Sequence, residues 1–210
     1  MPRGSEELTH ARKEEIIRAC ASLYETMSFK DITIKEIGAV TSFTRTSIYN
    51  YFQTKEEIFL ALFQQEYEKW IADLDEIAAK QETLTDDELA QELARSLEKR
   101  ALLLKLLSMN LYDMEENSRI ERLAEFKAAY GNSVRAVARL LEKFRPQMGP
   151  ADRQQFLYTF FPFIYGVYPY TVVTDKQRES METAGTDFVY ISTYEMIYTG
   201  TKRLLAGGQS

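Results

Sequence analysis

The sequence of 210 residues has very few of the side chains with which most enzymes bind metals or act as nucleophiles. It holds one cysteine, Cys20, and one histidine, His10, so a disulfide framework, a zinc cluster and a histidine-based catalytic triad lack the residues they need. Glycine-rich phosphate loops and the Gly-x-Ser-x-Gly turn of hydrolases are also absent. The adjacent carboxylates Asp86 and Asp87 do not face each other on a helix, so we expect them at the surface. The sequence predicts no enzyme, no metal site and no cofactor.

The lone cysteine and histidine are themselves expected to have no functional role. Cys20 falls on the apolar stripe of a predicted helix, which favours a packed core thiol over a redox sensor. His10 is expected in a tail before the first helix. Because the chain lacks cysteine pairs and a secretion-type start, we expect a reducing, cytoplasmic location.

Long apolar runs are scarce, although residues 154–174 carry no formal charge over 21 residues, a length that can span a bilayer. Tyrosines are spread through this segment instead of gathering at its ends, and Pro162 and Pro169 interrupt it. We therefore expect a buried or interfacial helix and no membrane partner.

The composition, 45% hydrophobic and 28% charged, is globular and excludes a disordered or fibrous chain. The net charge of −6 is unevenly distributed along the chain. Residues 1–55 hold eight Lys or Arg against seven Asp or Glu, a net charge of +1, and the remaining 155 residues carry a net charge of −7. A polyanion therefore meets the least repulsion on the first quarter of the chain.

Apolar residues recur at three- and four-residue spacings, and no hairpin pattern occurs, so the sequence predicts an all-α fold. Thr33 with Glu36 and Thr54 with Glu57 have the spacing of capping boxes, and Thr44 can cap a further helix. The expected helices cover residues 12–27, 33–40, 45–52, 54–80, 85–107, 118–145, 151–173 and 187–206.

The two short helices around residues 33–52, joined by a turn at 41–43, have the spacing of a helix-turn-helix. Ile48 and Phe52, four residues apart, are expected to face the core. The second helix then exposes side chains that reach base edges and phosphates: Arg45, Thr46, Ser47, Tyr49, Asn50 and Tyr51. A helical hairpin with a merely polar surface explains this pattern equally well.

A longer pattern of residues favours the first interpretation. It comprises Phe29, Thr33, Ile34, Ile37, Ser47, Ile48, Tyr49, Tyr51, Phe52, Lys55, Glu56 and Phe59. This stretch, above all the run from Tyr49 to Glu56, resembles the DNA-binding segment of the tetracycline-repressor (TetR) family of transcription regulators. The resemblance covers about residues 10–70. Ser42 and Thr46 stand where the family often has glycine, which puts the turn geometry and the base preference in question.

The resemblance implies an all-α homodimer with an N-terminal three-helix DNA-binding domain, residues 10–70, and a C-terminal helical bundle for ligand binding and dimerisation, residues 71–210. It also implies which residues contact double-stranded DNA: Thr33, Lys35, Thr44, Arg45, Thr46, Ser47, Tyr49, Asn50, Tyr51 and Lys55. A two-fold dimer requires a near-palindromic operator.

The C-terminal part offers candidates for two further surfaces. Apolar and aromatic residues suited to an effector pocket are Met109, Tyr112, Met114, Phe126, Tyr130, Phe160, Phe163 and Tyr165, for which simple core packing is the alternative. In the family the last two helices form the dimer interface, and residues at helical spacing there are Tyr190, Tyr194, Ile197, Thr201 and Leu204.

Together these features predict a DNA-binding regulator, a repressor released from its operator by an unknown small-molecule effector. The coupling is expected to pass through the long helix that begins at Lys55. Two alternatives stay open: a transcriptional activator, and a small-molecule-binding helical protein with a vestigial helix-turn-helix.

Overall fold

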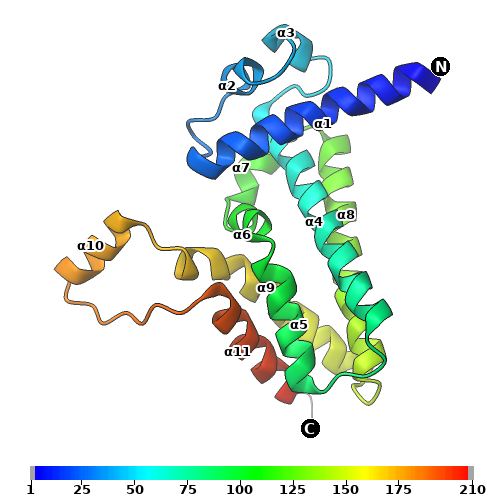
Figure 1. Cartoon of the computed structure of the whole chain (residues 1–210), viewed down its shortest axis with the longest axis vertical. Helices are drawn as coiled ribbons and strands as arrows, with labels where there is room; N and C mark the ends of the chain where they lie inside the picture. Colours follow the sequence, from blue (N-terminus) through cyan, green and yellow to red (C-terminus); the bar gives the residue numbers. More distant parts are fainter. Residues whose placement is uncertain (1–2, 208–210) are drawn as a thin grey trace. The chain divides into compact units, whose positions relative to one another are not determined.

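The computed structural model describes residues 3–207, which form eleven α-helices and no strand. The all-α fold class expected from the sequence is confirmed (Figure 1). The helices in chain order are α1 (Arg3–Thr26), α2 (Ile34–Ala39), α3 (Arg45–Ile48), α4 (Lys55–Lys80), α5 (Asp86–Glu98), α6 (Ala101–Leu107), α7 (Leu111–Glu116), α8 (Ile120–Phe144), α9 (Pro150–Thr171), α10 (Asp175–Thr183) and α11 (Thr193–Ala206).

Helix α1 begins well before the expected residue 12. His10 therefore lies inside α1 with an exposed side chain, and the expectation of a tail there was wrong. Residues 6–12 are exposed, so this part of the helix has no apolar stripe from which a periodicity is visible.

The segment 85–107, expected as one helix, is divided at Arg100 into α5 and α6. Arg100 has φ −107° and ψ 47°, outside the helical region. Its guanidinium donates to both carboxylate oxygens of Asp73 at 2.7 and 2.8 Å and to the carbonyl of Lys69 at 3.3 Å. Because both partners lie on α4, the local sequence gives no sign of the break.

Helices α7 and α10 and the start of α11 also differ from expectation. Asn110 caps the short α7, where its side chain accepts an amide hydrogen bond at 3.1 Å. Helix α10 buries none of its side chains, so it shows no amphipathic period. A capping box of Ser192 and Glu195 starts α11 at Thr193, so Tyr190 precedes the helix instead of lying within it.

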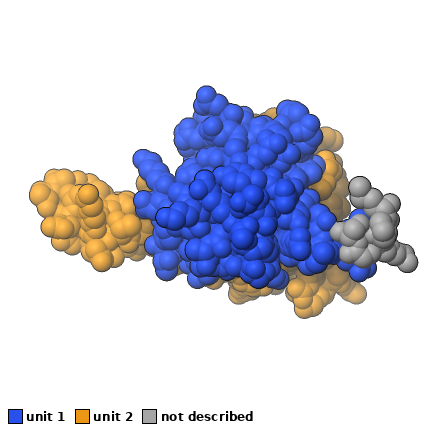
Figure 2. Space-filling model, turned by 90° about the horizontal axis from the view of Figure 1, so that it is seen from above, with its two compact units in different colours: residues 1–65, 110–130 blue, residues 66–109, 131–210 orange. Residues whose placement is uncertain are grey.

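The described residues form two compact units (Figure 2). Unit 1 comprises the residues up to Gln65 together with Asn110–Tyr130, and unit 2 comprises Glu66–Met109 together with the residues from Gly131 onward. Helices α4 and α8 contribute to both units. Asn110–Tyr130 lies with the N-terminal helices, although it falls within the range expected for the C-terminal domain.

The core of unit 1 is built from the apolar faces of α1 to α4 and α8. The ring of Tyr24 meets that of Phe59 edge-on, with centroids 5.1 Å apart, and Phe63 packs on Phe126 at 5.0 Å. Cys20 is fully buried here, and burial raises the pKa of its thiol well above the ordinary value. The thiol is therefore protonated at neutral pH, as expected of a core residue.

Unit 2 is centred on Trp70, which is fully buried and donates from Nε1 to Ser96 Oγ at 3.0 Å. Helix α11 packs against α5 and α9. Gly200 on α11 allows this close approach, because a Cβ at that position would lie 2.5 Å from Cζ of Phe163 on α9. Arg145 of this unit is buried and paired with Asp86, which fixes the start of α5.

Among the described residues, no single helix has the length and apolar character needed to cross a membrane. Helices α9 and α10 satisfy these criteria only as a pair, bent by 82° at the break between them. The uncharged segment 154–174 lies largely in α9, which buries Phe156, Phe160 and Ile164 in the core, as expected for a buried helix.

Candidate nucleic-acid interface

Side-chain caps define both short helices of the helix-turn-helix. Thr33 caps α2 and accepts from the amides of Lys35 and Glu36 at 3.2 and 3.4 Å. Thr44 caps α3 and accepts from the amide of Ser47 at 3.4 Å. The two caps predicted from the sequence are confirmed, and they fix where each helix begins.

Hydrogen bonds hold the turn between α2 and α3. The Thr41 hydroxyl lies 3.1 Å from the carbonyl oxygens of both Gly38 and Phe43. Ser42 donates from its amide and its hydroxyl to the carboxylate of Glu15 on α1. These bonds hold the pKa of Glu15 below its ordinary value, the amide bond contributing most.

The turn does not require glycine at Ser42. No residue other than glycine has a positive φ in the part of the chain that the structure describes. Serine therefore meets no backbone strain at this position, and it supplies the hydroxyl that Glu15 accepts.

The expected recognition helix, 45–52, is α-helical only over Arg45–Ile48 and continues as tight turns. The amide of Tyr51 donates to the Ile48 carbonyl at 2.9 Å, and that of Phe52 donates to the same carbonyl at 3.0 Å. Ile48 and Phe52 are buried, as predicted. Most of the candidate DNA contacts are exposed, namely Thr33, Lys35, Thr44, Arg45, Thr46, Tyr49 and Asn50, while Ser47, Tyr51 and Lys55 are half-buried.

Five of the predicted DNA contacts line one open hollow of about 450 Å³. Its lining residues are Thr33, Ile34, Lys35, Arg45, Tyr49, Thr54, Lys55 and Glu56. Arg45 reaches across this surface and donates to the Tyr49 hydroxyl at 3.1 Å. Three cationic side chains and three hydroxyls around one exposed hollow provide the donors that a phosphate requires.

Lys55, at the start of α4, is half-buried at the edge of this hollow. Its ammonium donates to the Phe29 carbonyl at 2.7 Å and lies 4.1 Å from the centre of the Phe29 ring. Because an ammonium has three donors, this anchoring leaves hydrogen-bonding capacity for a phosphate. The aromatic contact also fixes the direction of a long flexible side chain.

The hydroxyl of Tyr51 accepts a hydrogen bond from Arg12 on α1 at 3.2 Å. Sequence reasoning assigned Arg12 no role in the site, because the two residues lie 39 positions apart and nothing local links them. The Tyr51 hydroxyl thus already has a hydrogen-bond partner within unit 1. The side chains of Thr46 and Asn50, by contrast, are exposed.

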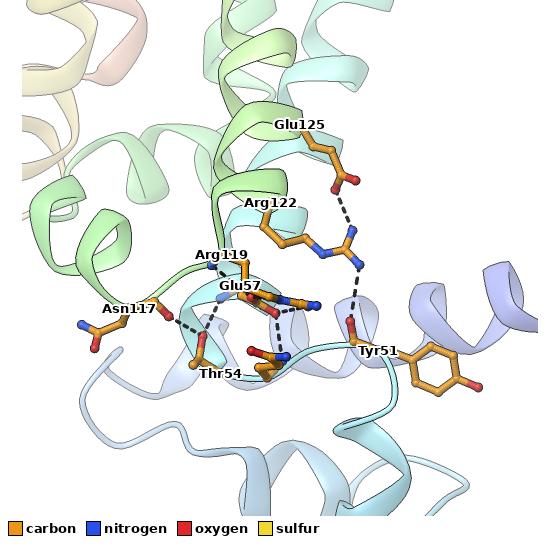
Figure 3. Close-up of polar contacts among 8 residues, drawn as sticks. Tyr51, Thr54, Glu57, Asn117, Arg119, Arg122 and Glu125 are labelled. Carbon is orange, nitrogen blue, oxygen red and sulfur yellow. Dashed lines mark hydrogen bonds and ion pairs between the residues drawn. The ribbon is translucent and has the colours of Figure 1, made fainter.

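A buried carboxylate lies at the start of α4, close to the residues that follow α3 in the chain (Figure 3). Glu57, in the first turn of α4, has 1% of its side chain exposed. It accepts hydrogen bonds from the amide of Gln53 at 2.8 Å and from Arg119, whose amide, Nε and Nη2 lie at 3.2, 2.6 and 2.7 Å. Sequence reasoning recognised Glu57 only as part of a helix cap and missed Arg119.

Two opposing effects act on the pKa of Glu57. Burial raises it, while the hydrogen bonds from Arg119 and the Gln53 amide, together with the charge of Arg119, lower it and prevail. The same pairing raises the pKa of Arg119. Both groups are therefore charged at neutral pH.

The eight predicted pocket residues are divided equally between the units: Tyr112, Met114, Phe126 and Tyr130 in unit 1, and Met109, Phe160, Phe163 and Tyr165 in unit 2. Tyr112 is 83% exposed, whereas Met114, Phe126 and Phe160 are buried. Tyr165 lies with its hydroxyl 3.1 Å from that of Tyr67. These residues stay candidates for an effector pocket.

The five predicted interface residues differ in accessibility. Ile197 and Thr201 are fully buried in unit 2, because α11 turns them toward α5 and α9. Tyr190 is exposed, and Tyr194 and Leu204 are half-buried. Leu204 lines a hollow of about 190 Å³ between α9 and α11. In the described part of the chain, no group of three or more His, Cys, Asp or Glu side chains has an arrangement that could hold a metal ion.

Two family models match the sequence, "Bacterial regulatory proteins, tetR family" over residues 16–62 and "Tetracyclin repressor-like, C-terminal domain" over residues 64–189. The chain therefore belongs to the tetracycline-repressor family of DNA-binding transcription regulators, as the resemblance predicted. No significant match to a curated protein was found.

Solved structures share the fold over nearly the whole chain. The fatty acid degradation regulator FadR of Bacillus halodurans has a TM-score of 0.62 at 14% identity, covering 94% of this chain and 96% of that one. FadR of Thermus thermophilus, a TetR-family repressor in complex with lauroyl-CoA, has a TM-score of 0.59 at 20% identity. The match covers 94% of this chain and 95% of that one. A TetR-family regulator of Marinobacter aquaeolei VT8 has a TM-score of 0.60 at 13% identity, and the match covers 93% of this chain and 88% of that one.

Proposed function

We propose that this protein is a transcriptional repressor that binds a near-palindromic operator as a homodimer and releases it when a small molecule binds the C-terminal helices. The observation that carries the DNA-binding part is the hollow lined by Thr33, Lys35, Arg45, Tyr49 and Lys55. Its donors suit phosphate, and the exposed side chains of Thr46 and Asn50 on the adjoining segment suit base edges.

Family membership supports the dimer, and a two-fold dimer places its two recognition helices about 34 Å apart, one turn of DNA. The exposed Tyr190 and the half-buried Tyr194 and Leu204 are the predicted interface residues that a second copy can reach. The domain division near residue 70 belongs to this proposal, with residues 10–70 binding DNA.

The DNA-binding part is tested by selecting duplexes from random DNA with the purified protein and footprinting the selected site. We expect a near-palindromic protected site, and we expect Tyr49→Ala to abolish specific binding while the dimer persists. Arg139→Ala, which removes an exposed side chain on α8, outside the expected DNA contacts and the two helices expected to form the dimer interface, is the control and keeps full binding. A Tyr49→Ala protein that still protects the site contradicts the assignment.

The effector part is tested with lauroyl-CoA as the first probe, because the Thermus thermophilus relative was solved with it. Release of the selected operator by lauroyl-CoA assigns acyl-CoA as the effector class. If lauroyl-CoA leaves the complex intact, a small-molecule screen on the same complex follows, and a screen without any releasing compound contradicts the ligand-controlled part alone.

A further inference from the structure

Six residues lie between α3 and α4, and the last four of them, Tyr51 to Thr54, are here called the linker. Contacts from one distant segment hold the linker (Figure 3). The hydroxyl of Thr54 donates to the carbonyl of Asn117 at 2.9 Å. Arg122 approaches the carbonyl of Tyr51 at 3.5 Å, and its guanidinium carbon lies 5.6 Å from the centre of the Phe52 ring.

Glu57 connects the linker to the same segment. Its carboxylate accepts from the Gln53 amide in the linker and, at the same time, from Arg119. All four linker residues are thereby in contact with Asn117, Arg119 or Arg122, directly or through Glu57. These three residues are here called the clasp.

The clasp belongs to unit 1, yet the chain runs from it into unit 2 on both sides. Helix α6 precedes it and belongs to unit 2, and α8, which begins at Ile120, continues into unit 2 beyond Tyr130.

We propose that Arg119 is a positioning residue for DNA recognition: by holding Glu57, it fixes the linker and so the orientation of the recognition helix. This inference rests on the proposed function and names a residue that positions its DNA-binding segment. Arg119 itself contacts no DNA in this scheme.

The test compares Arg119→Ala and Arg119→Lys with wild type. Lysine keeps the positive charge but cannot donate to both carboxylate oxygens of Glu57 in the way the guanidinium does. Arg119→Lys therefore tests the two-pronged hydrogen bonding in a variant that disturbs folding less than alanine does. Arg139→Ala is the matched control, because it removes another arginine, one that lies on α8 and forms an exposed ion pair with Asp75 at 2.7 Å.

The first measurement is amide hydrogen exchange of residues 45–54 in the free proteins. We expect exchange in this stretch to be about tenfold faster in Arg119→Ala, intermediate in Arg119→Lys and unchanged in Arg139→Ala, with the rest of unit 1 still protected. Unchanged exchange in both Arg119 variants overturns the proposal. So does loss of protection throughout unit 1 in both, which indicates a general structural role.

The second measurement is affinity for the selected operator and for a scrambled duplex over a range of salt concentrations. We expect Arg119→Ala to bind the operator about tenfold more weakly, with unchanged affinity for the scrambled duplex and an unchanged salt slope. Equal losses on both duplexes with a smaller slope identify Arg119 as a phosphate contact and overturn the positioning role.

The two proposals fail separately. If wild-type protein selects no DNA sequence, the proposed function is wrong, while the exchange measurement still decides whether the clasp orders the linker. If the operator is selected but Arg119→Ala binds it as wild type does, the proposed function stands and the positioning role is wrong.

Discussion

At the scale of single residues, Glu57 is a buried charge at the start of α4 in unit 1. Its carboxylate is almost completely buried, so the free energy of desolvation has to be offset by hydrogen bonds. Arg119 and the Gln53 amide supply them, and the guanidinium adds its charge. Because 39% of the Arg119 side chain is exposed, water screens part of this attraction.

Glu57→Gln is predicted to lower the free energy of unfolding at neutral pH by about 1–3 kcal/mol, because the arginine loses its charged partner. The pKa of Glu57 in the folded protein lies below the ordinary value of 4.5. The ionised carboxylate therefore contributes its full stabilisation of the folded state at pH values above 4.5, and this contribution is lost as the pH falls below 4.5. The difference between wild type and Glu57→Gln should therefore shrink on acidification. Urea unfolding of both proteins at pH 7 and at lower pH measures this difference in the free energy of unfolding. A difference that does not change with pH contradicts the stabilising role of the ionised Glu57.

At the scale of elements, the contact between α9 and α11 shows how one position sets a helix separation. A Cβ at Gly200 would lie 2.5, 2.8 and 3.2 Å from three ring atoms of Phe163, closer than packed atoms tolerate. By contrast, a Cβ at Gly166 on α9 meets nothing within 4 Å. The two glycines therefore have opposite consequences for stability.

Gly200→Ala is predicted to destabilise the protein by about 1–3 kcal/mol, because α9 and α11 have to separate or Phe163 has to leave its position. Gly166→Ala, the matched control, is predicted to be neutral or to stabilise by about 0.5–1 kcal/mol through helix propensity. Thermal and urea unfolding of both variants tests the pair. A Gly200→Ala protein as stable as Gly166→Ala shows that the helices are not held at this distance.

At the scale of the whole molecule, the uneven charge shapes how the protein meets DNA. The chain carries −6 in total, and all of the excess acid lies beyond residue 55. Non-specific attraction to DNA is therefore expected to be small, and under the proposed function operator affinity rests on the predicted phosphate contacts Lys35, Arg45 and Lys55.

If both protomers of the proposed dimer use these three cations, the logarithm of operator affinity is predicted to fall with the logarithm of salt concentration with a slope of about −5. Lys35→Ala should make this slope smaller by about two, one for each protomer. Lys176→Ala, which removes an exposed charge on α10, should leave it unchanged. Fluorescence anisotropy across a salt series measures the slopes, and equal slopes for both variants would falsify the assignment of Lys35 as a phosphate contact.

The sequence by itself determined the parts of the molecule that depend on neighbours along the chain. Thr33 and Thr44 cap amides within three residues, and the spacing of Ile48 and Phe52 is enough to assign them to the core. The family segment was recognisable for the same reason, because its candidate DNA contacts follow one another from Thr33 to Lys55, within the residues that the family model matches. Hydrogen bonds of one helical turn and periodic burial are local properties, so a linear sequence displays them.

Only the tertiary structure decided which distant side chains meet. Arg119 pairs with Glu57 across 62 positions, and Arg100 interrupts a continuous helical pattern because Asp73 on another helix holds it. The exposed start of α1 and the whole of α10 bury nothing that would produce a pattern. Contacts of this kind exist only once the chain has folded. The sequence contains many charged residues that could pair with one another, and only the packing of the helices decides which of them meet.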